Sequence, residues 1–131
     1  MSEVFKELIP QETLLIAFGS IIGSLLRLYL TRIFFVIFSR KYLGTLIVNS
    51  IASFLLALLW ASSIYKNTYY SKFILFYATG FLGSLSTFST YIIEVLEAFI
   101  NKYWIEALVI AFASVLVSVF FGWIGLLIAF D

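Results

Sequence analysis

The sequence contains no cysteine, no histidine, a single proline and few charged residues. Of its 131 residues, 11% are charged and 63% are hydrophobic, whereas a soluble domain has about 25% charged residues. Without cysteine there are no disulfides or thiolates, and without histidine the commonest metal ligand and neutral-pH proton carrier is missing. Eight scattered Lys and Arg residues against seven Asp and Glu leave no electrostatic basis for nucleic-acid binding. This composition indicates an integral membrane protein.

Four hydrophobic stretches are each long enough to cross a bilayer as a helix. A span requires roughly 20 mainly apolar residues, and the sequence meets this requirement at 13–38, 44–65, 73–100 and 104–130. The connectors are short, which makes neighbouring helices antiparallel. We therefore predict an all-α integral membrane protein, with residues 1–131 forming a single four-helix transmembrane domain.

The charges that flank the spans are evenly distributed. Orientation in the membrane follows the Lys and Arg content of short loops. Three basic residues lie on the side of the N-terminus and three on the opposite side: Lys6, Lys66 and Lys72, and Arg40, Lys41 and Lys102. One interpretation is that the chain inserts in both orientations and pairs as an antiparallel dimer. The other is that weaker signals select one orientation.

The third span contains small and polar residues at its centre. Residues 80–91 include two Gly and five Ser or Thr, which weaken a helix or compete for its backbone bonds. We predict a break near residues 83–87, at the membrane midplane, because the midpoint of 73–100 falls between Ser86 and Thr87. Non-helical backbone at that depth must be buried in protein or line a cavity, and its carbonyls can coordinate a cation. The alternative is a kinked helix whose hydroxyls bond to their own turn.

Three further side chains within the spans are candidates for binding an anion. Asn49 can present an amide N–H, or it can form an interhelical hydrogen bond that only holds the helices together. Phe88 and Tyr91 share a helix face and can turn their positively charged ring edges to an anion. The alternative for these two rings is core packing.

Charged and small residues inside the spans leave further alternatives open. Arg27, the most deeply placed basic residue, can cap the carbonyls of the break, line an anion vestibule or pair with Glu94. Gly19 and Gly23 are four residues apart and can serve an oligomer interface or packing within the chain. We expect packing within the chain for these two glycines.

The sequence resembles the Fluc/CrcB family of fluoride channels in three stretches, namely 23–27, 44–49 and 80–94, and the run 83–91 is the most specific. Its length, four spans and balanced charge are similar too. The resemblance implies a passive fluoride-selective channel that exports cytoplasmic fluoride across the prokaryotic plasma membrane, without enzymatic activity or an organic cofactor. It also implies an antiparallel dual-topology dimer with two pores and a central structural sodium ion. The implied partners are fluoride, the lipid bilayer and a second copy of the chain, with a heterodimer left open.

The resemblance assigns roles to individual positions. It implies that the fluoride pathway is formed by Asn49, Phe88, Tyr91, Ser89, Thr90, Ser114 and Ser118. The backbone carbonyls of Gly83 and Ser86 would hold the sodium ion, and Arg27 would be a vestibule or structural charge. Two positions depart from the family pattern, because Tyr91 replaces a second phenylalanine and Ile110 replaces a tyrosine.

Three other kinds of function remain as alternatives. A small multidrug-resistance-like proton-coupled exporter needs a membrane-buried carboxylate, for which Glu94 is the only plausible residue, and proton dependence would distinguish it. A membrane enzyme is disfavoured because the sequence has no HExxH motif, no GxSxG motif and no intramembrane Asp pair. A purely structural scaffold would carry no ion flux.

Overall fold

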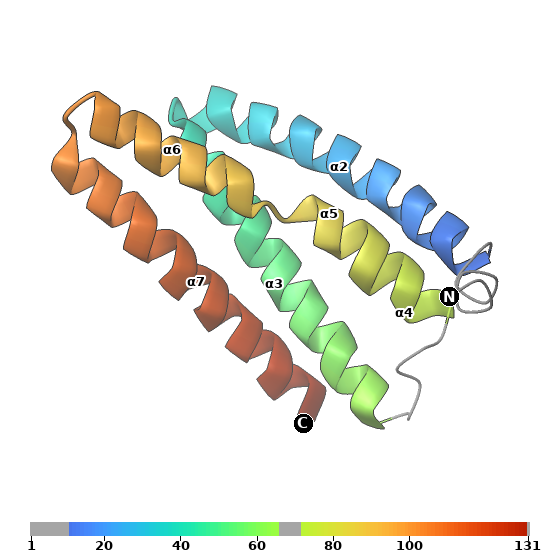
Figure 1. The fold of residues 1–131 in the computed structure, drawn as a ribbon. Coiled ribbons are helices and arrows are strands. Elements are labelled where there is room, and N and C mark those ends of the chain that lie inside the picture. The colour runs from blue at the N-terminus through green and yellow to red at the C-terminus, as the bar shows by residue number, and fades with distance from the viewer. Residues whose placement is uncertain (1–10, 66–71, 131) are drawn as a thin grey trace, which may run out of the picture.

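The computed structural model describes residues 11–65 and 72–130, and every element in these two ranges is helical (Figure 1). The elements are α2 (Gln11–Phe38), α3 (Lys41–Tyr65), α4 (Lys72–Ile74), the π-helix η1 (Leu75–Leu82), α5 (Gly83–Leu85), α6 (Phe88–Ile100) and α7 (Trp104–Phe130). Four stretches are long and apolar enough to cross a membrane: Glu12–Phe38, Lys41–Ser63, Lys72–Ile100 and Trp104–Phe130. The predicted all-α fold with four spans is confirmed. Lys6, Lys66 and most of the predicted second connector lie outside the described residues.

The turn between α2 and α3 is shorter than predicted. The sequence indicated a helix start at residue 44, but α3 already begins at Lys41. Ser39 has a left-handed backbone with φ of 56°, and its N–H donates to the Phe35 carbonyl at 2.8 Å. A single residue in this conformation ends a helix and redirects the chain, so two residues suffice for the turn.

The turn between α6 and α7 depends on another left-handed residue, Lys102, with φ of 63°. Its N–H donates to the Phe99 carbonyl at 3.0 Å, and the Tyr103 N–H donates to the Ala98 carbonyl at 2.9 Å. This pair of bonds is the Schellman arrangement that satisfies the last carbonyls of a helix. Both tight turns lie at the same end of the molecule (Figure 1).

The third span is interrupted in its middle. Ser86 (φ −75°, ψ 155°) and Thr87 (φ −148°, ψ 123°) are extended, so the kinked continuous helix is excluded. The break is narrower than the predicted 83–87, because Gly83 keeps helical angles and α5 continues to Leu85. Ser86 is the central residue of the span Lys72–Ile100. The π-helical turns before the break were not predicted, because the sequence carries no pattern that separates i→i+5 from i→i+4 bonding.

The two halves of the third span have different neighbours. The first half, from α4 to α5, packs along α2, whereas α6 packs against α7. Helix α3 contacts both α2 and α7 (Figure 1). The break therefore lets one span change its packing partner halfway along its length.

Glycines bring α2 close to the first half of the third span. A Cβ added to Gly23 would overlap the Phe81 carbonyl oxygen, and one added to Gly80 would lie 2.7 Å from the Ile16 carbonyl oxygen. Gly19 faces the same π-helical segment. As expected, Gly19 and Gly23 serve packing within the chain.

Candidate functional site

A cavity of about 290 Å³ lies beside the break and collects polar side chains from three helices. It is lined by Asn49 and Ser53 of α3, by Ser86, Thr87, Phe88 and Tyr91 of the third span, and by Ser114, Val115, Ser118 and Val119 of α7. Five of the seven residues predicted for a fluoride pathway thus meet around one space. An amide, several hydroxyls and two rings can surround a small anion there without a fixed opposite charge.

Asn49 holds the backbone of the break through two hydrogen bonds. The Thr87 N–H donates to Asn49 Oδ1 at 2.8 Å, and Asn49 Nδ2 donates to the Thr87 carbonyl at 3.0 Å. A backbone N–H can only donate and a carbonyl can only accept, so this pairing fixes the orientation of the amide. The amide carries a second N–H beyond the one given to Thr87. Asn49 therefore forms the predicted interhelical bonds, and it also lines the cavity.

At the break, the Gly83 and Ser86 carbonyls are without their helical donors. In a continuous α-helix the Thr87 N–H would bond to the Gly83 carbonyl and the Thr90 N–H to the Ser86 carbonyl. Instead, the Thr87 N–H donates to Asn49, and the Thr90 N–H donates to Thr87 Oγ1 at 3.3 Å. Gly83 and Ser86 are the two positions at which the sequence predicted cation-binding carbonyls.

The remaining contacts of these two carbonyls are long. The Gly83 oxygen accepts from Ser86 Oγ at 3.4 Å, and the Ser86 oxygen accepts from Arg27 Nη1 at 3.4 Å. Both distances exceed the usual range for strong hydrogen bonds. Of the three arrangements considered for Arg27, the structure contains the contact with a carbonyl of the break.

The two rings of the predicted pathway lie together but differ in exposure. The centroids of Phe88 and Tyr91 are 5.5 Å apart with an interplanar angle of 50°. Phe88 is 73% exposed on the surface of the single chain, whereas Tyr91 is 8% exposed. The Tyr91 hydroxyl donates to the Ala111 carbonyl at 2.8 Å, so Tyr91 is fastened to α7.

Ser89 and Thr90 are not among the residues that line this cavity. Both are exposed on the chain surface at the start of α6. Thr90 Oγ1 accepts from Thr87 Oγ1 at 3.1 Å, and the hydroxyls of Ser89 and Thr87 are 3.3 Å apart. The structure therefore separates these two predicted pathway residues from the other five.

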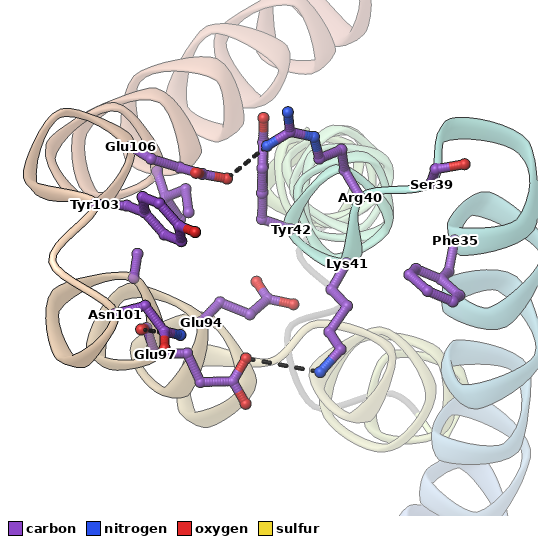
Figure 2. A pocket seen from close by; sticks show the side chains of 12 residues that line it. Phe35, Ser39, Arg40, Lys41, Tyr42, Glu94, Glu97, Asn101, Tyr103 and Glu106 are labelled. Carbon is purple, nitrogen blue, oxygen red and sulfur yellow. Dashed lines mark hydrogen bonds and ion pairs between the residues drawn. The ribbon is translucent and has the colours of Figure 1, made fainter.

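A second cavity, of about 560 Å³, opens at the end that carries the two tight turns. Figure 2 shows Arg40 and Lys41 reaching from the start of α3 toward Glu106 and Glu97, with the Glu94 carboxylate pointing into the space between them. Arg40 Nη1 lies 2.8 Å from Glu106 Oε1, and Lys41 Nζ lies 3.7 Å from Glu97 Oε2. This cavity offers charged groups of both signs near a membrane surface.

Glu94 points into this cavity without pairing with Arg27. Glu94 Oε1 accepts from Thr45 Oγ1 at 2.6 Å. Thr45, Asn49 and Ser53 follow one another at four-residue intervals on α3. Thr45 bonds to Glu94 of the larger cavity, and Asn49 and Ser53 line the smaller one. Their shared helix face was visible in the sequence, but Ser53 was not singled out as a site residue.

A buried cluster separates the two cavities. Tyr91 and Ile110 belong to it, together with Val95, Ala98 and Ala107. Ile110, at 3% exposure, is one turn from Ser114 on α7. The two positions that depart from the family pattern thus belong to one buried cluster, in which Tyr91 lines the smaller cavity and Ile110 lines the larger one.

Thr87 is a functional residue that the sequence reasoning did not identify. It caps α6 through its hydroxyl, bonds to Asn49 through its backbone and lines the smaller cavity. Its place within the predicted break at residues 83–87 was the available signal. The partner of the Thr87 backbone, Asn49 of α3, could not be predicted because it depends on the tertiary fold.

Comparisons with known proteins identify relatives over nearly the whole chain. Residues 14–126 match the family described as CrcB-like protein, Camphor Resistance (CrcB). A fluoride-specific ion channel FluC of Thermosipho melanesiensis is 38% identical over 117 residues, covering 88% of this chain and 93% of the relative. Those of Mannheimia succiniciproducens and Histophilus somni are 36% and 33% identical, covering 90% and 87% of this chain and 93% and 90% of the respective relatives. These relatives are channels and not enzymes.

Proposed function

The chain belongs to the CrcB/FluC family of fluoride channels, and we propose that Asn49, Phe88, Tyr91, Ser114 and Ser118 form its fluoride pathway. It is a multi-pass protein of the cell membrane. The observation that carries the proposal is the cavity beside the break, where these five side chains meet. In this proposal the chain is a single four-helix transmembrane domain that passively exports cytoplasmic fluoride.

The chemistry of the cavity suits a small, strongly hydrated anion. A pore must replace the water around the ion with other donors, yet must not bind it too tightly for it to leave. The second N–H of Asn49 and the hydroxyls of Ser114 and Ser118 are neutral donors. The ring edges of Phe88 and Tyr91 add weak positive charge. Among the residues that the structure describes, no Lys or Arg lines this cavity, so the ion is solvated without being trapped.

The larger cavity acts as an entrance in this proposal. Arg40 and Lys41 give it basic groups at its rim, while Thr45 continues the polar face of α3 toward Asn49. Between the two cavities the ion passes the constriction that contains Tyr91 and Ile110. Movement of side chains in this cluster would then set the rate of passage.

Exposed polar groups support an antiparallel dimer. Ser89, Thr90 and Gly83 are exposed near the middle of the third span, where contact with lipid is unfavourable for polar groups. In a dual-topology dimer the two-fold axis lies in the membrane plane, so a break at the midplane faces the same break in the second copy. A second copy would cover these groups, and two pores would follow from the symmetry.

The carbonyls of Gly83 and Ser86 fit a structural sodium ion on this axis. Both have lost their helical donors, and unwound backbone carbonyls are the groups that hold sodium in other broken membrane helices. The Arg27 contact with Ser86 is long and leaves a second lone pair on the oxygen. Each copy would contribute two oxygens, and the ion would join the two breaks.

Fluoride efflux from liposomes tests the proposed pathway. The purified chain is reconstituted with potassium fluoride inside, valinomycin starts efflux, and a fluoride electrode follows it beside a chloride control. We expect rapid fluoride release without chloride release, and its loss in Asn49→Ala and Phe88→Ile. Phe112→Ile is the matched control, because Phe112 is exposed on α7 outside the cavity.

Two results would contradict this pathway. If Phe88→Ile and Phe112→Ile release fluoride at the same rate, the cavity is not part of the ion path. Release that requires a proton gradient and disappears in Glu94→Gln would instead favour the exporter. Absence of release from well-folded protein would exclude a homodimeric channel and direct attention to a heterodimer.

A further inference from the structure

We propose that Asn49 and Thr87 are positioning residues for the cation site at the break, because together they keep the Gly83 and Ser86 carbonyls open. This inference rests on the sodium site of the proposed function. It adds that Asn49, a residue of the anion pathway, also determines whether the cation site exists. The two ion sites would therefore share one side chain.

The first carbonyl depends on Asn49. The Thr87 N–H is the group that would close the helix onto the Gly83 carbonyl, and Asn49 Oδ1 accepts it at 2.8 Å instead. Asn49 Nδ2 donates to the Thr87 carbonyl at 3.0 Å. Both backbone polar groups of Thr87 therefore bond to Asn49 of α3 and not to their own helix. Removing the amide would leave the Thr87 N–H without this partner. The strongest replacement acceptor is the Gly83 carbonyl, four residues earlier.

The second carbonyl depends on Thr87. The Thr90 N–H would bond to the Ser86 carbonyl in a continuous helix, but Thr87 Oγ1 accepts it at 3.3 Å. This is an N-cap bond, in which a hydroxyl substitutes for a missing helical acceptor. Without the hydroxyl, the Thr90 N–H would turn back toward Ser86. Valine has the shape of threonine without the hydroxyl, so Thr87→Val removes this bond together with the hydroxyl contacts to Thr90 and Ser89.

The test measures sodium binding through thermal stability rather than through ion flux. A ligand that binds only the folded state raises the unfolding temperature as its concentration increases. The purified full-length chain is heated in detergent across a series of sodium chloride concentrations, with choline chloride keeping the ionic strength constant. For the unchanged chain we expect a sodium-specific rise that begins near the dissociation constant of the site and then continues with the logarithm of the sodium concentration.

Four variants separate positioning from general damage. In Asn49→Ala and Thr87→Val, the sodium concentration at which the rise begins should increase about tenfold, since each loses one bond that frees a carbonyl. Thr87→Ser retains the hydroxyl and should keep the original sodium concentration. Phe88→Ile should lose fluoride efflux but keep the sodium response, because its side chain takes part in neither bond.

Each outcome has a definite meaning. An unchanged sodium response in Asn49→Ala or in Thr87→Val overturns the positioning role of that residue while leaving the fluoride pathway intact. If Asn49→Ala does not fold, the comparison of Thr87→Val with Thr87→Ser decides whether freed carbonyls form the site. If sodium does not raise the unfolding temperature of the unchanged chain specifically, both the sodium site and this inference are overturned. The fluoride efflux measurement tests the proposed channel function independently.

Discussion

At the scale of single residues, Tyr91 differs in its role from the exposed Phe88. Its hydroxyl is already used by the Ala111 carbonyl, at 2.8 Å. Tyr91 therefore presents its ring, rather than its O–H, to the cavity. The hydrogen bond also fixes α6 to α7 beside Ile110, the other position that departs from the family pattern.

Two substitutions of Tyr91 should distinguish the contribution of its ring from that of its hydroxyl. We expect Tyr91→Phe to lower the free energy of unfolding by about 0.6 kcal/mol, the typical value of one hydrogen bond between membrane helices. Its fluoride efflux should fall less than that of Tyr91→Leu, which also loses the ring. Unfolding in detergent and efflux from liposomes measure the two effects. Equal loss of efflux in both variants would show that the hydroxyl itself serves the ion.

The sequence predicted the residue types that line the cavity beside the break better than it predicted the contacts between them. Asn49 could be proposed because an amide within a span is unusual, whereas the assignment of Phe88 came from the family resemblance. Ser89 and Thr90 were expected in the same pathway, but one and two residues of helix rotate them away from the direction of Phe88. The bond between Asn49 and Thr87 joins residues 38 apart in sequence, so no local pattern could reveal it.

At the scale of elements, the interruption of the third span was predictable and its surroundings were not. Glycine, serine and threonine in the middle of a span predict a break, because glycine weakens a helix and the two hydroxyl residues compete for its backbone bonds. Which of those residues leave the helix depends on outside partners. Asn49 and the Thr87 hydroxyl take the N–H groups that follow Ser86, so Gly83 stays helical and the break begins later.

The close contact between α2 and η1 predicts opposite effects for two glycine substitutions. Gly23→Ala should destabilise the chain by about 1–3 kcal/mol, because the new methyl group meets the Phe81 backbone, which cannot move aside alone. Gly122→Ala is the matched control, since its Cβ would lie at an ordinary 3.7 Å from the Ser53 carbonyl oxygen. There we expect a gain of about 0.5–1 kcal/mol from lower backbone entropy loss. Thermal unfolding of both variants in detergent is the measurement, and equal effects would contradict the packing argument.

At the scale of the whole molecule, the balance of flanking charge predicts insertion in two orientations. Arg40, Lys41 and Lys102 all lie at the end with the two tight turns, and Lys72 begins α4 at the other end. With similar numbers of basic residues at the two ends, neither orientation in the membrane is favoured. The helical content and span number followed directly from composition, whereas the orientation requires an experiment.

The natural absence of cysteine makes that experiment simple. Asn101 is exposed and uncharged in the turn between α6 and α7, so Asn101→Cys adds one thiol without altering the charge balance. A membrane-impermeant maleimide applied to intact cells should label about half of the chains, because neither orientation is favoured. Labelling after membrane permeabilisation gives the total. Complete labelling from one side, or none, would contradict dual topology.

The exchange of neighbours along the third span has a consequence for biosynthesis. A chain emerges from the ribosome with its N-terminus first, and α2 and α3 precede the third span in the sequence. The segment from α4 to α5 can therefore pack on α2 as soon as it enters the membrane, whereas α6 must wait for α7, which is translated last. Until then the N–H groups after Ser86 depend on Asn49 and on Thr87 itself. Translation arrested before α7 would leave the break packed on α2 and α3, with the smaller cavity open to lipid on the side that α7 later covers.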